Sequence, residues 1–111
     1  MMVKKIYLLE METDSGERFH KIGISKNVER RVKTLQTGNC FDIKTVYVFD
    51  TEIGELTEST LHRLYAPLHK RGEWFELDDE QVESFPQKFE QTEKNLVIMI
   101  NENTYWKKYN T

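Results

Sequence analysis

Residues 19–39, FHKIGISKNVERRVKTLQTGN, decide the fold because an extended segment turns there directly into a helix. The first part places Phe19, Ile22 and Ile24 among small or polar residues, and Gly23 permits the close approach of a neighbouring backbone. This composition predicts a β-strand that ends where the helix begins. Because the connection is so short, the helix must lie next to the strand, and side chains of the two elements are brought close together.

The second part of this stretch has the pattern of a helix with one apolar face. Asn27 is a good N-cap, because its short side chain accepts a hydrogen bond from a backbone N–H of the first turn. Val28, Val32 and Leu35 recur at i, i+4 and i+7, which places them on one helical face. Gly38 suits the position just after a helix, so the helix is expected to end there.

Two adjacent arginines of this helix are expected in different surroundings. Arg31 lies roughly 65° from the centre of the apolar face, whereas Arg30 points almost directly away from it. We therefore expect Arg31 along the edge of the core and Arg30 in bulk water. This asymmetry makes Arg31 the first candidate for a functional side chain.

The rest of the chain predicts one α+β domain, since 111 residues suffice for one modest core. Apolar and β-branched segments predict strands at residues 4–11 and 43–49, and the first of these forms a hairpin with residues 17–25. Helices follow in the second half. The expected architecture is an α/β sandwich, in which a small three-stranded, mainly antiparallel sheet is flanked by helices. We expect this domain over residues 1–92, with a C-terminal extension, residues 93–111, packed on it.

The second helix is predicted over residues 57–68. Four apolar side chains fall on one of its faces and are expected in the core: Leu61, Leu64, Tyr65 and Leu68. The opposite flanks of this helix carry polar residues.

The segments after this helix alternate between extended and helical character. Residues 72–77, GEWFEL, predict a short extended segment. Asp78 or Asp79 then caps a third helix, and Pro86 is expected to kink or restart it, because an interior proline costs about 3 kcal/mol. Residues 96–100 predict a strand or a segment packed over the sheet.

Charge is distributed unevenly over a chain whose net charge is −3. Residues 18–44 hold 7 Lys or Arg against 2 Asp or Glu, whereas residues 73–111 hold 4 against 9. The basic region is read in two ways, as a surface that meets a phosphate backbone or as a solvated helix face. Charge alone does not decide between them.

Cysteine content and hydropathy exclude some classes of protein. Cys40 is the only cysteine, so there is no disulfide framework and no thiolate zinc cage. The chain shows no signal peptide and no apolar run near 18 residues. We therefore expect a cytoplasmic protein with no membrane partner.

Four polar side chains stand where a core face does not require them: Tyr7, Lys21, Arg31 and Glu58. They comprise a phenol, two cations and a carboxylate, without a nucleophilic Ser or Cys beside a base, so they favour phosphodiester hydrolysis over acyl transfer. A single carboxylate, together with substrate phosphate and water, is enough to hold Mg²⁺. Each residue also has an ordinary structural explanation, such as a core tyrosine or a surface ion pair.

Ordered motifs link these residues to a known family. Lys5-Ile6-Tyr7 corresponds to a GIY motif and Lys21-Ile22-Gly23 to a YIG motif. The chain also reads K-I-G-x-S, R…L-Q-T-G-N, E…L-H and G-E-W-F at residues 21–25, 31–39, 58–62 and 72–75. Over about residues 5–77 it resembles the GIY-YIG nuclease superfamily, in particular its bacteriophage-associated, DNA-binding branch.

The resemblance implies a GIY-YIG-like fold and a role for each matching residue. Tyr7 would position or activate the attacking water, Arg31 would clamp the scissile phosphate, and Glu58 would hold one Mg²⁺ or Mn²⁺. Lys21 replaces the tyrosine of the second motif and would bind phosphate or lower the pKa of a neighbouring phenol. Leu35 stands where many active members carry His or Tyr.

Three functions are compatible with this reading. The leading one is a metal-dependent DNA endonuclease that uses Tyr7, Lys21, Arg31 and Glu58. The second is a nucleic-acid-binding module with little or no cleavage, and the third is a phage accessory protein whose acidic C-terminal face docks on another protein. Under the first two, the expected contacts to nucleic acid are Lys26, Arg30, Lys33 and His62.

Overall fold

The computed structural model describes the backbone of residues 3–110 and the side chains of residues 3–102. In this part of the chain the strands are β1 (Lys4–Glu12), β2 (Arg18–Ser25), β3 (Ile43–Thr51), β4 (His69–Arg71) and β5 (Trp74–Phe75). The helices are α1 (Val28–Thr37), α2 (Gly54–Leu64) and α3 (Asp79–Asn110), with a 3₁₀ turn, η1, at Ala66–Leu68. The α+β fold class is thereby confirmed.

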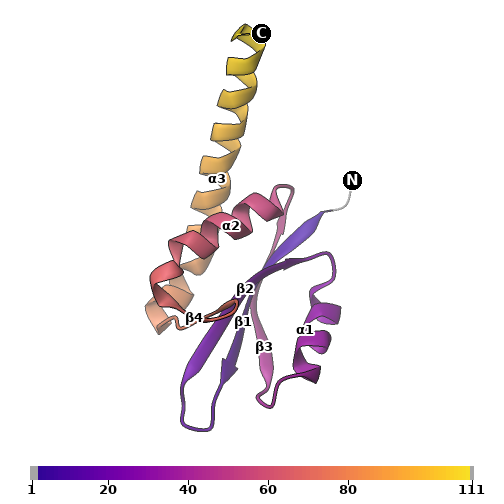
Figure 1. Cartoon of the computed structure of the whole chain (residues 1–111), viewed down its shortest axis with the longest axis vertical. Coiled ribbons are helices and arrows are strands. Elements are labelled where there is room, and N and C mark those ends of the chain that lie inside the picture. Colours follow the sequence, from indigo (N-terminus) through magenta and orange to yellow (C-terminus); the bar gives the residue numbers. More distant parts are fainter. Residues whose placement is uncertain (1–2, 111) are drawn as a thin grey trace.

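The sheet order is β3-β1-β2-β5-β4, and every pairing is antiparallel. Figure 1 shows α1 on one face of the sheet and α2 with α3 on the other. Because helices pack on both faces of the sheet and β1 lies between β2 and β3, residues 6–9 are all buried. This explains why β1 reads as a nearly continuous apolar run rather than an alternating one.

The β1–β2 hairpin sets which side chains share a face, and its prediction is confirmed. Tyr7 lies opposite Gly23 and Leu9 lies opposite Lys21. Residues directly opposite in an antiparallel pair project to the same side of the sheet, so all four point to the α1 face. Gly16 closes the turn with a φ of +87°, which only glycine adopts without strain.

α1 forms as predicted from its caps and its apolar face. The Asn27 side chain accepts a hydrogen bond from the Arg30 backbone N–H at 3.1 Å, and Gly38 is the C-cap. Val28 is buried, and Val32 and Leu35 pack against the cluster that contains Tyr7 and Leu9. The helix therefore stays close to the strand that precedes it.

The sheet has five strands, so the prediction of three was wrong. The two additional strands, β4 and β5, form a small hairpin whose turn contains Gly72 at a φ of +60°. β4 reads HKR and is exposed throughout, so it carries no apolar alternation from which a strand is predicted. β5 pairs only with His20 and Lys21 of β2.

α2 also differs from its prediction. It begins at Gly54, three residues early, because the missing side chain of Gly54 allows the helix to lie against Ile24. It ends at Leu64 and is followed by η1. Leu61 and Tyr65 are buried as expected, but Leu64 is 48% exposed.

α3 runs through Pro86 without a restart, so of the two expected effects of this proline the restart does not occur. Tertiary packing outweighs the local cost of the proline, because Phe85 and Phe89 are buried on either side of it. The rings of Phe89 and Phe49 stack with their centroids 4.5 Å apart. The Glu93 carboxylate accepts hydrogen bonds of 2.5 Å from the hydroxyls of Thr51 and Thr57. These contacts fix the first half of α3 on the body.

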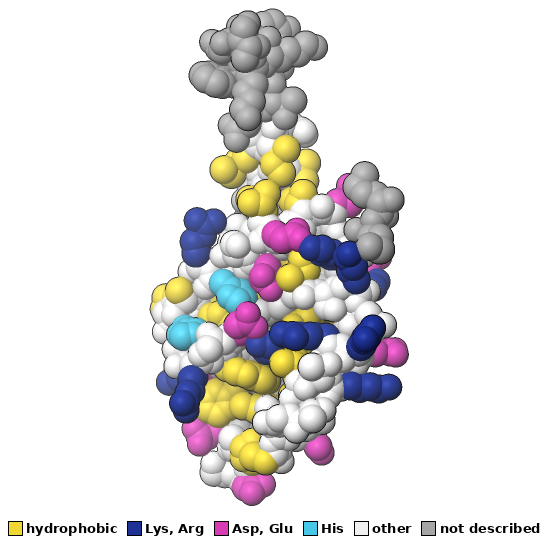
Figure 2. Space-filling model, turned by 45° about the vertical axis from the view of Figure 1, so that its right-hand side comes forward, with side chains coloured by type: hydrophobic (Ala, Val, Ile, Leu, Met, Phe, Trp, Pro, Cys, Tyr) yellow, Lys and Arg dark blue, Asp and Glu magenta, His cyan; other side chains and the backbone are white. Residues whose placement is uncertain are grey.

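The prediction of a strand at residues 96–100 was wrong, because these residues continue α3. Val97, Ile98 and Met99 are between 45% and 56% exposed. Figures 1 and 2 show this part of the helix projecting beyond the sheet, with hydrophobic side chains on its surface. Residue 111 and the side chains after residue 102 of the expected extension lie outside the described part. None of the described helices combines the length and apolar character needed to cross a bilayer.

Substituting Gly23 tests the placement of Tyr7. A Cβ at Gly23 would lie 2.7 Å from Cε1 of the Tyr7 ring, which is only 1% exposed and has little room to move. We expect Gly23→Ala to lower the free energy of unfolding by about 1–3 kcal/mol in urea denaturation. Gly38→Ala is the matched control, because nothing lies within 4 Å of its Cβ position. Its effect should stay within about 1 kcal/mol and be stabilising. Equal stability of the two variants would contradict the contact.

Candidate active site

Tyr7 reaches the site from β1 across Gly23. The absence of a side chain at Gly23 lets the phenol ring lie directly over the neighbouring strand. Burial raises the pKa of Tyr7, and interaction of its hydroxyl with the Arg31 guanidinium partly opposes this. The negative charges of Glu73 and Glu58 add to the increase. The phenol is therefore neutral at physiological pH, with its hydroxyl directed at the polar cluster.

Lys21 reaches the same face from β2 and is 5% exposed. Its ammonium contacts the Glu73 carboxylate and lies 5.7 Å from the centre of the Trp74 ring. The pairing of β2 with β5 places Trp74 opposite Lys21, so the hairpin of β4 and β5 supplies both contacts. A nearly buried ammonium is thus held between a carboxylate and an aromatic face.

Arg31 and Arg30 lie in different surroundings, although both are exposed. The Arg31 guanidinium interacts with the Tyr7 hydroxyl by hydrogen bonding and by charge, and it lowers the pKa of Glu73. Arg30 is not among the main influences on the pKa shifts of Tyr7, Glu58 and Glu73. The helix therefore presents one arginine to the site and the other away from it.

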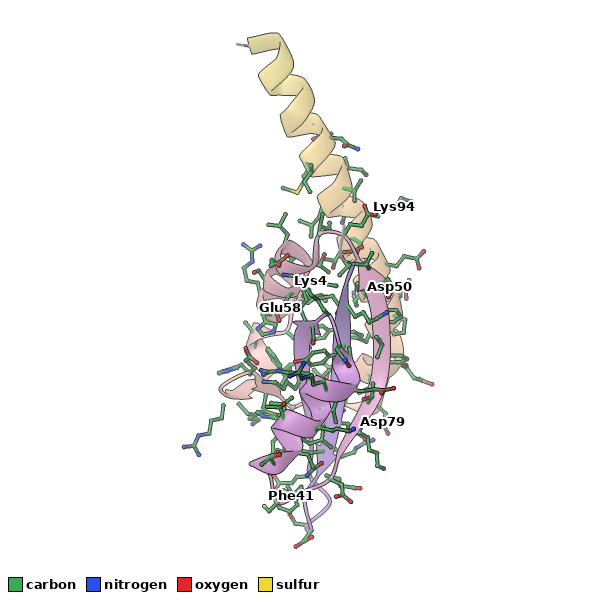
Figure 3. All side chains as sticks on the ribbon, turned by 90° about the vertical axis from the view of Figure 1, so that its right-hand side faces the viewer. Lys4, Phe41, Asp50, Glu58, Asp79 and Lys94 are labelled. Atoms are coloured by element: carbon green, nitrogen blue, oxygen red, sulfur yellow. The ribbon has the colours of Figure 1, made fainter. Side chains whose placement is uncertain are left out.

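Glu58 enters the site from α2 and is half-buried (Figure 3). Burial raises its pKa, the charges of His62 and Lys21 oppose this, and the charge of Glu73 adds to it. Among the residues with described side chains, none forms a hydrogen bond or an ion pair with the Glu58 carboxylate. Glu58 is therefore a partly desolvated carboxylate without a neutralising contact, which is a suitable environment for a cation.

His62 follows Glu58 by one helical turn and lies against the sheet. Its Nε2 is 2.7 Å from the Ile22 carbonyl oxygen, to which it donates, and its ring meets the edge of Phe75 with centroids 5.2 Å apart. β5 pairs with His20 and Lys21 only, so the carbonyl of Ile22 is left for a side chain. In this structure His62 anchors α2 to β2, whereas its expected contact with nucleic acid stays a prediction.

Sequence reasoning missed Glu73. It contacts Lys21, its pKa is lowered chiefly by that contact, and its charge acts on Tyr7 and Glu58. The signal was present in the G-E-W-F motif, where a carboxylate precedes the tryptophan that pairs with Lys21. Only the register of β5 shows that this carboxylate faces the site.

The other expected nucleic-acid contacts are exposed cations on α1 or just before it. Lys26 precedes α1, and Arg30 and Lys33 lie on it. In the described part of the chain none of the three forms an ion pair, whereas Lys4 and Lys5 contact Glu55 and Asp50. Figure 2 shows basic, acidic and histidine side chains intermingled at the middle of this face. The surface thus offers unneutralised positive charge next to the cluster.

The donor set fits a hard divalent cation only in part. Residues 3–102 contain no group of three or more His, Cys, Asp or Glu side chains that would enclose a metal ion. The charge of Glu73 raises the pKa of Glu58, and the charges of both carboxylates raise the pKa of Tyr7. One or two carboxylates, completed by substrate phosphate and water, are the usual protein contribution to a Mg²⁺ site. The residues therefore fit Mg²⁺ or Mn²⁺ bound together with a phosphate.

A comparison with protein-family models matches residues 4–90 to the T5orf172 domain. The chain belongs to this family. The T5orf172 domain is a phage-associated domain related to GIY-YIG nucleases, and this relationship suggests a nuclease or DNA-binding role. No curated protein and no solved structure matches the chain. The match covers the whole sheet, α1, α2 and the start of α3, so all residues of the cluster lie inside this T5orf172 domain.

The pKa of Glu58 gives a test of its environment. Because this pKa is raised above 4.5, the folded protein holds the Glu58 proton more tightly than the unfolded chain does. The resulting stabilisation is present below about pH 4.5 and is lost as the pH rises through the folded-state pKa. Glu58→Gln should therefore raise the melting temperature at pH 7, by up to about 3 °C, and leave it unchanged near pH 4.

The matched control is Glu55→Gln, one turn earlier on α2. Contact with Lys4 lowers the pKa of Glu55, so this substitution is expected to leave or lower the melting temperature at pH 7. Thermal unfolding followed by circular dichroism measures both. A Glu58→Gln protein that melts below the wild type at pH 7 would show that the carboxylate is neutralised by a partner.

Proposed function

We propose that this protein is a metal-dependent DNA endonuclease of the GIY-YIG type, which hydrolyses phosphodiester bonds. The observation that carries the proposal is that Arg31 on α1 and Glu58 on α2 both act on the hydroxyl of Tyr7 on β1, so three different elements contribute. Membership of the T5orf172 family supports it. A phenol, a guanidinium and a carboxylate without a cation partner are the groups that such a hydrolysis requires.

Tyr7 orients the attacking water in this proposal. Its raised pKa keeps the phenol neutral, so its oxygen accepts a hydrogen bond from water while its proton remains available for donation. The adjacent guanidinium of Arg31 stabilises negative charge that develops on the phenol oxygen if its proton is shared. Gly23 leaves the space in which the ring lies, because a side chain at this position would collide with it.

Arg31 and Lys21 bind the phosphate. A guanidinium presents parallel N–H groups to two phosphate oxygens and remains charged at all physiological pH values. Lys21 adds a point charge from the strand below, and its burial increases the strength of that charge in the site. Together they offset the negative charge that grows on the phosphate in the transition state.

Glu58 would hold the divalent cation, and the charge of Glu73 also acts at this position. When bound, Mg²⁺ or Mn²⁺ supplies Lewis-acid stabilisation of the phosphate and lowers the pKa of coordinated water. The raised pKa of Glu58 means that protons compete for this carboxylate under mildly acidic conditions. Cation affinity is therefore expected to fall as the pH is lowered towards that pKa.

The exposed cations Lys26, Arg30 and Lys33 extend the contact along the DNA backbone. Their charge is not neutralised by described acidic residues, so it is available to phosphates on either side of the scissile one. Binding through such contacts weakens steeply as salt is added. They position the duplex but carry no sequence information.

A second candidate function is nucleic-acid binding with little cleavage. The contact between Lys21 and Glu73 favours it, because an ammonium engaged by a carboxylate is not free for a phosphate. Leu35 also packs with the α1 face, where many active members carry a polar residue. Docking on a protein through the acidic C-terminal face is a third possibility, and it stays a prediction.

The two arginines of α1 provide the decisive pair of variants. In a plasmid-nicking assay with Mg²⁺, Arg31→Ala is expected to lower the cleavage rate by about 10²–10³-fold, the usual effect of removing one donor to a developing oxyanion. Arg30→Ala removes the same charge from the same helix but faces away from the cluster. It should weaken DNA binding slightly and leave the rate at saturating protein near that of the wild type.

Several results would contradict the proposal. Equal loss of cleavage in both arginine variants would show that only the positive charge of the helix matters, and not the position of Arg31 in the cluster. Cleavage by wild type that persists in EDTA, or in Glu58→Gln, would remove the divalent cation from the reaction. DNA binding without cleavage by the wild type would leave the binding module as the function.

A further inference from the structure

Glu73 is the residue of the cluster for which the proposed hydrolysis has no direct use. Its carboxylate contacts the ammonium of Lys21, whose side chain is 7% exposed, while its own side chain is 50% exposed. It stands next to Gly72 in the turn of the hairpin formed by β4 and β5. A half-exposed carboxylate thus covers a nearly buried cation that faces the proposed phosphate position.

The charges of the cluster cancel in the free protein. Lys21 and Arg31 contribute two positive charges, and Glu58 and Glu73 contribute two negative charges, with Tyr7 neutral. A phosphodiester brings a further negative charge to a site that has no net positive charge to receive it. A bound divalent cation would give the cluster a net positive charge. Removing the negative charge of Glu73 would also make the net charge more positive, by one unit.

We infer that Glu73 occupies Lys21 in the free protein in place of a substrate phosphate, and thereby makes DNA binding at this site depend on a divalent cation. The inference rests on the proposed function, since it takes a DNA phosphate as the ligand of Lys21. A cation bound at Glu58 would offer the Glu73 carboxylate a second partner, and Lys21 would then be available to the phosphate. Glu73 therefore acts through Lys21 and is a positioning residue.

The local structure allows such an exchange without disturbing the core. β4 and β5 have three residues and two residues, and β4 is fully exposed, so the turn that carries Glu73 is weakly held. The Trp74 ring lies 5.7 Å from the Lys21 ammonium and continues to face it when Glu73 moves. Phe75 is 2% exposed and anchors the hairpin to the core.

A purely structural role for Glu73 predicts the opposite result. If the carboxylate only holds Lys21 in place, its removal leaves the ammonium misplaced and weakens phosphate binding. If it competes with phosphate, its removal strengthens DNA binding when no divalent cation is present. The sign of the change in affinity therefore separates the two roles.

The test compares the wild type with Glu73→Gln and Glu76→Gln by fluorescence anisotropy on a labelled DNA duplex at one fixed salt concentration. Each protein is measured in EDTA and in Ca²⁺. Glu76 is the matched control, because it pairs with Lys70 at 3.2 Å beside the same hairpin and has no effect on the resolved pKa shifts of the cluster. Both substitutions change the net charge by the same amount.

We expect the wild type to bind at least about tenfold more tightly in Ca²⁺ than in EDTA. Glu73→Gln in EDTA should bind at least about tenfold more tightly than the wild type in EDTA, and its gain from Ca²⁺ should be smaller. Glu76→Gln should follow the wild type in both buffers. Melting curves verify that each variant is folded under the conditions of the binding assay.

Three outcomes would overturn the inference. Glu73→Gln may bind no better than the wild type in EDTA, Glu76→Gln may gain as much as Glu73→Gln, or none of the proteins may bind in either buffer. Cleavage in Mg²⁺ is measured separately on the wild type. Tighter binding by Glu73→Gln together with an inactive wild type would uphold the inference about phosphate binding and refute the endonuclease.

Discussion

The packing of the Tyr7 ring over Gly23 is the contact on which the rest of the site depends. It requires the register in which β1 and β2 place these two residues directly opposite each other. A slip of one residue between the two strands would place Tyr7 and Lys21 on opposite faces of the sheet. Burial of apolar side chains on both faces of β1 prevents such a slip, because every alternative register exposes part of the core.

The remaining groups are brought to this hairpin by contacts outside the cluster. The buried hydroxyls of Thr51 on β3 and Thr57 on α2 both donate to Glu93 and so connect these elements to α3, and His62 attaches α2 to β2. These contacts hold Glu58 in an environment that penalises its charge. The charged Glu58 side chain therefore lowers the stability of the fold, and packing elsewhere compensates for this. Such a local loss of stability is common where a protein prepares a position for a ligand.

Much of this arrangement was predictable from local sequence patterns, and the failures have physical causes. The cap at Asn27, the hairpin and the orientation of Arg31 follow from rules that act over a few residues. The strands at His69–Arg71 and Trp74–Phe75 are too short to show a period, and the continuation of α3 through Pro86 depends on distant aromatic packing. Glu73 escaped notice because its role arises from strand pairing.

The central claim is that side chains from separate elements form one cation-assisted phosphate site. The most direct measurement is anomalous diffraction from a crystal of the protein soaked with Mn²⁺. The account predicts a Mn²⁺ peak bound by the Glu58 carboxylate, on the side of the sheet that carries the Tyr7 hydroxyl and Arg31. A soaked crystal with no peak at Glu58, or with Mn²⁺ bound only at a different acidic position, would contradict it.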